Sequence, residues 1–121
     1  MGKTKTTDKK KKINQRQKGA KGEREFAKLL REHGYEAERG CQHSGGKDSP
    51  DVKTNMPKVH WEVKRTERLR FHEAIEQSKR DAGEDEMAVV AYRRNRSEWI
   101  VIQPFEEWIE LYNAWAREQK K

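Results

Sequence analysis

The segment from Val59 to Lys64 constrains the fold most, because the polarity of its side chains alternates at every position. The apolar and the polar residues fall into two sets of three: Val59, Trp61 and Val63 in one, His60, Glu62 and Lys64 in the other. Successive side chains of a β-strand point to opposite sides. The pattern therefore predicts a strand with one face in the core and one charged face that is a candidate site.

A second acid, Asp51, is expected to approach Glu62 across a hairpin. Asp51-Val52-Lys53 begins a strand, Asn55-Met56-Pro57 makes the turn, and Lys58 to Arg65 returns as the next strand. Two carboxylates held together repel each other, and a divalent cation with oxygen ligands relieves that repulsion. A metal, two carboxylates and the lysine two positions after Glu62 form a set suited to phosphodiester hydrolysis.

Composition indicates a polyanionic partner. The chain has 121 residues, enough for one domain, and 40% of them are charged, with a net charge of +7. Such a basic surface favours nucleic acid.

No apolar run is long enough to span a bilayer or to form a signal peptide, which predicts a soluble cytoplasmic protein, or one of the host cytoplasm if a phage encodes it. Cys41 and His43 lack partners at zinc-ligand spacing, so a zinc site there is not expected.

The positive charge is concentrated at the start of the chain. Residues 1–18 contain almost no aliphatic side chains, so we expect a disordered basic arm, followed by one folded domain at residues 19–121. The arm is expected to tether the protein to DNA phosphates, and a solubilising tail is the alternative. The candidate DNA-binding residues are Lys9, Lys10, Lys11, Lys12, Arg16, Lys18, Lys21 and Arg24.

The first expected helix, Gly22 to His33, places Glu23 on the same side as its apolar residues. The helix is expected to end at Gly34. A carboxylate on a packing face is costly unless it is paired or bound to a metal, so Glu23 is a candidate site residue. The alternative is a first-turn acid that is stabilised by the helix dipole.

The remaining pattern predicts an α/β fold, with a central mixed sheet flanked by helices. The expected elements are a strand at Tyr35 to Arg39, a loop at Gly40 to Ser49, a helix at Leu69 to Ala82, strands at Met87 to Tyr92 and Trp99 to Ile102, and a last helix after Pro104. The last helix has a broad aromatic stripe. Core packing is the first interpretation of that stripe, and a subunit interface is the second.

Between Lys18 and Val90 the chain resembles the PD-(D/E)xK nuclease superfamily. Pro50-Asp51 and Glu62-Val63-Lys64 fill the motif of that superfamily, and Lys18-Gly19-Ala20-Lys21-Gly22-Glu23-Arg24-Glu25 looks like the opening helix of archaeal-type Holliday junction resolvases and of the small resolvases of some phages. The resemblance implies a restriction-endonuclease-like fold. It also implies site residues: a catalytic set of Glu23, Asp51, Glu62 and Lys64, with Ser44 and Gln77 in supporting roles.

The resemblance further implies metal-dependent cutting of four-way DNA junctions by a homodimer. Asp51, Glu62 and the carbonyl of Val63 would hold Mg²⁺, with Mn²⁺ as a substitute, while Glu23 would contact a water or a second ion. Lys64 would steady the attacking hydroxide. Two alternatives remain open, because a fold and a metal site do not set the substrate: a nicking, flap or restriction-like nuclease, and a DNA-binding module without catalysis.

Overall fold

Five strands form one mixed sheet in the computed structural model, which describes residues 18–40 and 51–121. The strands follow one another across the sheet in chain order: β1 (Ala37–Arg39), β2 (Val52–Thr54), β3 (Val59–Arg65), β4 (Met87–Arg93) and β5 (Ile100–Ile102). Strands β3 and β4 are parallel, and all other neighbours are antiparallel. The expected mixed sheet is confirmed. The basic arm before residue 18 and the loop with Cys41, His43 and Ser44 lie outside the described residues.

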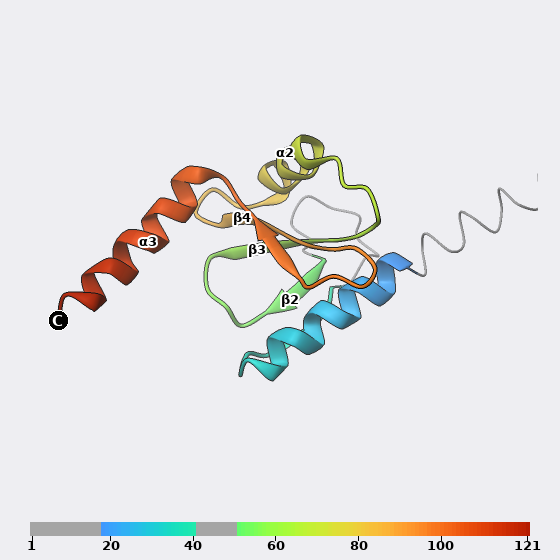
Figure 1. The fold of residues 1–121 in the computed structure, drawn as a ribbon, viewed down its shortest axis with the longest axis horizontal. Helices are drawn as coiled ribbons and strands as arrows, with labels where there is room; N and C mark the ends of the chain where they lie inside the picture. The colour runs from blue at the N-terminus through green and yellow to red at the C-terminus, as the bar shows by residue number, and fades with distance from the viewer. Residues whose placement is uncertain (1–17, 41–50) are drawn as a thin grey trace, which may run out of the picture.

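Two helices cover opposite faces of the sheet (Figure 1). The N-terminal helix, residues 18–32, lies on one face, and α2 (Phe71–Asp81) lies on the other and connects the parallel strands β3 and β4. A crossover helix of this kind is what two parallel neighbouring strands require. The third helix is α3 (Phe105–Gln119). No described helix combines the length and the apolar composition that crossing a membrane requires.

Element boundaries differ from the sequence expectation by a few residues. The N-terminal helix already covers residue 18, four positions before its expected start, whereas the strands and α2 differ by one or two positions. Gly34 has a φ of 94°, and the N–H of the following residue, Tyr35, donates to the carbonyl of Leu30. A left-handed glycine with such a bond ends the helix as expected.

The main core lies between the N-terminal helix and β3. The rings of Phe26 and Trp61 meet edge to face, with centroids 4.7 Å apart, and both side chains are buried. Val63, two positions after Trp61, points to the same core. The other face of β3 therefore lies toward α2. The sequence predicted the division into an apolar and a charged face, but not which helix covers the charged one.

Gly22 allows the N-terminal helix to approach β3 closely. A Cβ atom built on Gly22 would lie 2.5 Å from the Cβ of Arg65, the last residue of β3. Glu25, one helical turn after Gly22, pairs with Arg65 at 3.5 Å and with Arg93 of β4 at 3.0 Å. This contact fixes the start of the helix against the ends of two strands, and it positions Glu23 between these two anchor points.

The expected core role of the last helix is wrong. None of the residues of α3 is buried, and Trp108 and Trp115 are 47% and 58% exposed. Figure 1 shows α3 leading away from the sheet, and its described anchor is a bond from the N–H of Ala88 to Glu107 in the first turn. Helical periodicity specifies an apolar face but does not say what that face contacts, which is why the sequence left both interpretations open.

Candidate active site

Asp51 and Glu62 lie next to each other on the sheet face that α2 covers. Asp51 comes directly before β2, where Val52 pairs with Trp61, so Asp51 falls opposite the position of Glu62. The N–H of Asp51 donates to the carbonyl of Trp61 at 3.2 Å, and Oδ2 of Asp51 accepts a 2.8 Å hydrogen bond from the N–H of Val63. The hairpin therefore brings the two acids together, with the backbone of Val63 beside them.

The pKa of Asp51 is raised because its carboxyl group is buried next to Glu62. Burial is the largest cause that raises the pKa of Asp51 from 3.8 to about 7, and the neighbouring charge of Glu62 is the second. Glu23 raises this pKa further, whereas the hydrogen bond from Val63 lowers it. A carboxyl group in this state gains from a bound cation, because the cation favours the charged form that the neighbouring acids disfavour.

Glu62 is only 4% exposed and lies between two cationic or titratable side chains of the same strand. Its Oε1 lies 3.7 Å from Nζ of Lys64, and its Oε2 lies 3.8 Å from Nε2 of His60. Lys64 also donates a 3.0 Å hydrogen bond to Oε1 of Gln77 in α2. Strand alternation thus places His60, Glu62 and Lys64 in one row, and α2 contributes the residue that holds Lys64.

Glu23 reaches the edge of this site from the other side of the sheet. Its carboxylate is 12% exposed and forms a 2.6 Å ion pair with Arg39, the last residue of β1. The sequence pattern indicated Glu23 but not Arg39, because nothing local to β1 signals a partner on the N-terminal helix. The negative charge of Glu23 therefore helps to raise the pKa of Asp51, while the ion pair with Arg39 holds the Glu23 side chain in place.

The other candidate residues are distributed more widely. Lys21 and Arg24 are exposed on the N-terminal helix, and Lys18 is partly exposed near its start. Ser44 and the candidates Lys9, Lys10, Lys11, Lys12 and Arg16 lie outside the described residues. The N-terminal helix that carries these three cations lies on the opposite face of the sheet from α2.

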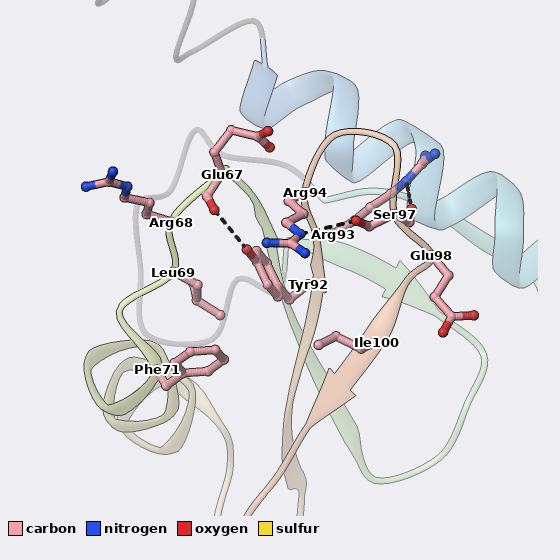
Figure 2. A pocket seen from close by; sticks show the side chains of 10 residues that line it. All are labelled: Glu67, Arg68, Leu69, Phe71, Tyr92, Arg93, Arg94, Ser97, Glu98 and Ile100. Atoms are coloured by element: carbon pink, nitrogen blue, oxygen red, sulfur yellow. Dashed lines mark hydrogen bonds between the residues drawn. The ribbon is translucent and has the colours of Figure 1, made fainter.

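A groove of about 720 Å³ opens beside Tyr92, which is the register partner of Lys64 in the neighbouring strand. Figure 2 shows Phe71, Tyr92 and Ile100 around one hollow, with the phenyl and phenol rings 6.3 Å apart. Charged side chains form the border of the groove: Glu67, Arg68, Arg93, Arg94 and Glu98. The groove thus combines apolar side chains with a border that carries three arginines.

Two further residues belong to this neighbourhood although the sequence pattern assigned them no role. His60 is buried against Glu62, and that contact raises the pKa of His60 above 6.5 although burial lowers it. Asp81, the last residue of α2, comes within the same cluster. The alternation in β3 already placed His60 on the charged face without giving it a role, whereas the position of Asp81 depends on how α2 docks, which no local pattern states.

The donor set of Asp51 and Glu62 fits a hard divalent cation. Both side chains offer oxygen atoms, as Mg²⁺ prefers, and a bound cation would favour the charged form of Asp51, whose pKa is raised by burial and by the neighbouring acids Glu62 and Glu23. Lys64 supplies the only described ammonium group within ion-pair distance of Glu62. The arrangement can therefore hold a metal next to a fixed positive charge, which is suited to the hydrolysis of a phosphate ester.

The chain matches the model of a known protein family over most of its length. The family model of the archaeal Holliday junction resolvase (hjc) matches residues 14–110, a stretch that includes Glu23, Asp51, Glu62 and Lys64. No match was found among curated proteins. The matched stretch covers well over half of the chain, and the five-stranded mixed sheet agrees with the fold expected for such a nuclease. The chain therefore belongs to the archaeal Holliday junction resolvase family, a family of PD-(D/E)xK nucleases.

Proposed function

We propose that this protein cuts four-way DNA junctions by metal-dependent phosphodiester hydrolysis, with Mg²⁺ as the ion. The observation that carries the proposal is the contact between Asp51 and Glu62 on the α2 face, with Nζ of Lys64 3.7 Å from the Glu62 carboxylate. Membership of the resolvase family supports a branched DNA substrate. The net charge of +7 agrees with a polyanionic partner.

Each side chain of the site has a distinct role in this proposal. Asp51, Glu62 and the carbonyl of Val63 would hold Mg²⁺, which when bound polarises the scissile phosphate and favours ionisation of a water molecule. Lys64 would steady the attacking hydroxide, and Gln77 would keep the ammonium group of Lys64 in place. Glu23 would orient a water or a second ion at the edge of the site.

The surface on both sides of the site suits a branched duplex. The groove beside Tyr92 would take a DNA strand on one side, and its exposed arginines, Arg68 and Arg94, would contact phosphates. On the other side, Lys18, Lys21 and Arg24 of the N-terminal helix and the lysines that precede them would contact a second arm without reading its sequence.

The same function requires two sites, because a resolvase must cut two strands symmetrically. We propose that a second copy of the chain covers the aromatic face of α3. Four aromatic side chains follow one another along this face with ring centroids 5.3 to 6.3 Å apart: Phe105, Trp108, Tyr112 and Trp115. An exposed row of this size resembles the centre of a protein interface, and a twofold axis lets one such face pack against its own copy.

The dimer is tested by measuring the molar mass in solution by light scattering. Trp115→Lys places a charge in the proposed interface, at the last position of the aromatic row, and should convert a dimer into a monomer. Ala114→Lys is the matched control, because residue 114 is exposed on the opposite side of the same helix and should leave the dimer intact. A wild-type monomer at micromolar concentration, or a dimer that survives Trp115→Lys, would contradict this interface.

A cleavage assay on defined DNA substrates tests the activity. The full chain is incubated with a four-way junction, a flap and a linear duplex of the same arm sequences, with and without Mg²⁺. The proposal expects paired cuts in the junction, only in the presence of the ion, with 5′-phosphate and 3′-hydroxyl ends. Preferred cutting of the flap or the duplex would favour the other nuclease class, and binding without cutting would favour a DNA-binding module.

A further inference from the structure

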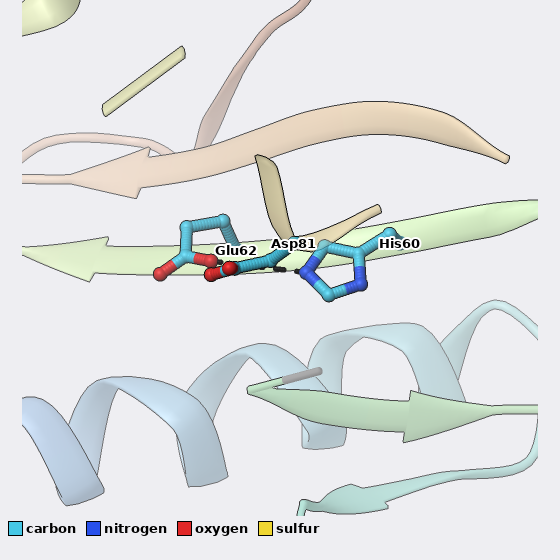
Figure 3. Close-up of side chains that lie close together, drawn as sticks. All are labelled: His60, Glu62 and Asp81. Atoms are coloured by element: carbon cyan, nitrogen blue, oxygen red, sulfur yellow. Dashed lines mark ion pairs between the residues drawn. The ribbon is translucent and has the colours of Figure 1, made fainter. Parts of the chain in front are cut away.

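Three side chains with metal-binding atoms meet at the end of the site that lies farthest from Lys64 along β3. His60, Glu62 and Asp81 each offer one ligand atom, and these atoms all lie within 4.8 Å of one another. Figure 3 shows the carboxylates of Glu62 and Asp81 beside the imidazole of His60. Two of the residues come from alternate positions of β3 and the third from the end of α2, so the fold itself brings them together.

His60 points into this cluster without a hydrogen-bond partner. Its side chain is 2% exposed, and Nε2 has no partner among the residues that the structure describes. Oε2 of Glu62 is 3.8 Å away from Nε2, which is too long for a hydrogen bond. Buried polar atoms in this state call for an additional ligand.

The chemistry of the cluster differs from that of the Asp51–Glu62 pair. One imidazole nitrogen and two carboxylate oxygens suit first-row transition ions such as Zn²⁺, whereas Mg²⁺ prefers oxygen ligands alone. Ligand atoms about 2.0 to 2.2 Å from one zinc ion are about 3.4 Å apart in a tetrahedral site, so the three side chains need only small movements. Asp81 is partly exposed, which provides an entry path for the ion.

We propose that His60, Glu62 and Asp81 form a transition-metal site that regulates the neighbouring nuclease site negatively. Glu62 belongs to both sites: its Oε1 faces Lys64, and its Oε2 faces His60. An ion held by His60 and Asp81 would draw the Glu62 carboxylate away from Asp51 and would add positive charge beside the Mg²⁺ position. Zn²⁺ binding would therefore compete with the Mg²⁺-dependent state. The binding part of this proposal stands alone, and the inhibition part rests on the proposed function.

The binding part is tested in a background that lacks the neighbouring carboxylate. Zn²⁺ is titrated by calorimetry into the full-length Asp51→Asn protein at about pH 8, because an imidazole binds a metal ion only in its neutral form. Adding Asp81→Asn should weaken Zn²⁺ affinity by at least about tenfold. Adding Asp85→Asn is the matched control, because Asp85 is an exposed acid four positions later, outside the cluster, and it should change nothing.

A second measurement needs no change in the cluster itself. Nitrogen-15 NMR of the histidine rings in the Asp51→Asn protein should show Nε2 of His60 shifting on addition of Zn²⁺. The site is refuted if Zn²⁺ binds with equal affinity in the Asp81→Asn and Asp85→Asn backgrounds, if it does not bind, or if the His60 ring is unaffected.

The inhibition part is measured as the ratio of junction cutting in Mg²⁺ with and without micromolar Zn²⁺. Zn²⁺ should lower the rate of the wild-type protein, and Asp81→Asn should require at least about tenfold more Zn²⁺ for the same loss. Equal sensitivity of Asp81→Asn and Asp85→Asn would overturn the regulatory role. If the wild-type protein cuts no DNA, the proposed function fails while calorimetry and NMR still decide whether the metal site exists.

Discussion

Nζ of Lys64 donates a 3.0 Å hydrogen bond to Oε1 of Gln77, which joins β3 to α2 beside the paired carboxylates. The same ammonium group lies 3.7 Å from Glu62. A neutral amide is a suitable partner for this lysine, because it restricts the side chain without neutralising its charge. The contact also explains how a residue of the second helix can influence a site that is built on a hairpin.

We expect Gln77→Ala to lower the rate of junction cutting by about tenfold while Mg²⁺ affinity and DNA affinity stay close to wild type, because only the position of Lys64 is disturbed. Lys64→Ala should cost more, about a hundredfold or more, since it removes the charge itself. Single-turnover rates at saturating Mg²⁺ measure both effects. The control is Glu76→Ala, an exposed neighbour in α2. A Gln77→Ala rate equal to that of the control would show that Lys64 needs no such support.

The acid pair predicts that metal binding releases a proton. The pKa of Asp51 is raised to about 7, mainly by burial and then by Glu62, so below that pH the ion must displace a proton. Mg²⁺ affinity should therefore fall by up to about tenfold per pH unit below pH 7 and level off above it. Calorimetry in two buffers with different ionisation enthalpies measures the proton release directly. Affinity that does not change between about pH 5.5 and 8 would contradict the raised pKa.

The raised pKa of Asp51 also determines whether the metal-free protein becomes more or less stable as the pH rises. A carboxyl group whose pKa is higher in the folded than in the unfolded chain stabilises the fold at low pH, and this contribution is lost as the pH rises through about 7. The raised pKa of His60 acts in the same direction. The metal-free protein should therefore melt at a lower temperature at pH 8 than at pH 6, and Asp51→Asn should reduce this difference. A melting temperature that rises over this range would refute the assignment.

Gly22 provides a test of the close contact between the N-terminal helix and β3. In Gly22→Ala the new Cβ would meet the Cβ of Arg65 at 2.5 Å, so the free energy of unfolding should fall by about 1–3 kcal/mol. Gly19→Ala is the matched control in the same helix, where no atom lies within 4 Å of the new Cβ. That change should be neutral or stabilise by up to about 1 kcal/mol. Chemical denaturation measures the free energy of unfolding of both variants. Equal values for Gly22→Ala and Gly19→Ala would show that the new Cβ at residue 22 does not clash with Arg65.

Much of the site could be predicted because its geometry is local. Strand alternation alone places Glu62 and Lys64 on one face, and a short hairpin is enough to bring Asp51 beside them. The N-terminal helix was also predictable in outline, since its apolar periodicity marks the face that meets Trp61. These inferences need only the period of one element, or the pairing of two neighbouring elements.

The rest depends on contacts between distant elements. The pairing of Glu23 with Arg39 and the meeting of Asp81 with His60 are set by how a helix docks on the sheet, and neither partner is marked by its own sequence neighbours. The same reason explains the error for α3. Its aromatic stripe is a sound amphipathic pattern, but the described chain offers nothing that buries it.

The central claim is that Asp51 and Glu62 hold the ion on which cutting depends, and one comparison tests it most directly. The rate of four-way junction cutting in Mg²⁺ is measured for the wild type, Asp51→Asn and Glu62→Gln, together with junction affinity in Ca²⁺. The account predicts that each variant loses at least about a hundredfold in rate while its affinity for the junction is retained, because a metal ligand is lost and the basic surface is kept. Cutting by either variant at close to the wild-type rate would contradict it.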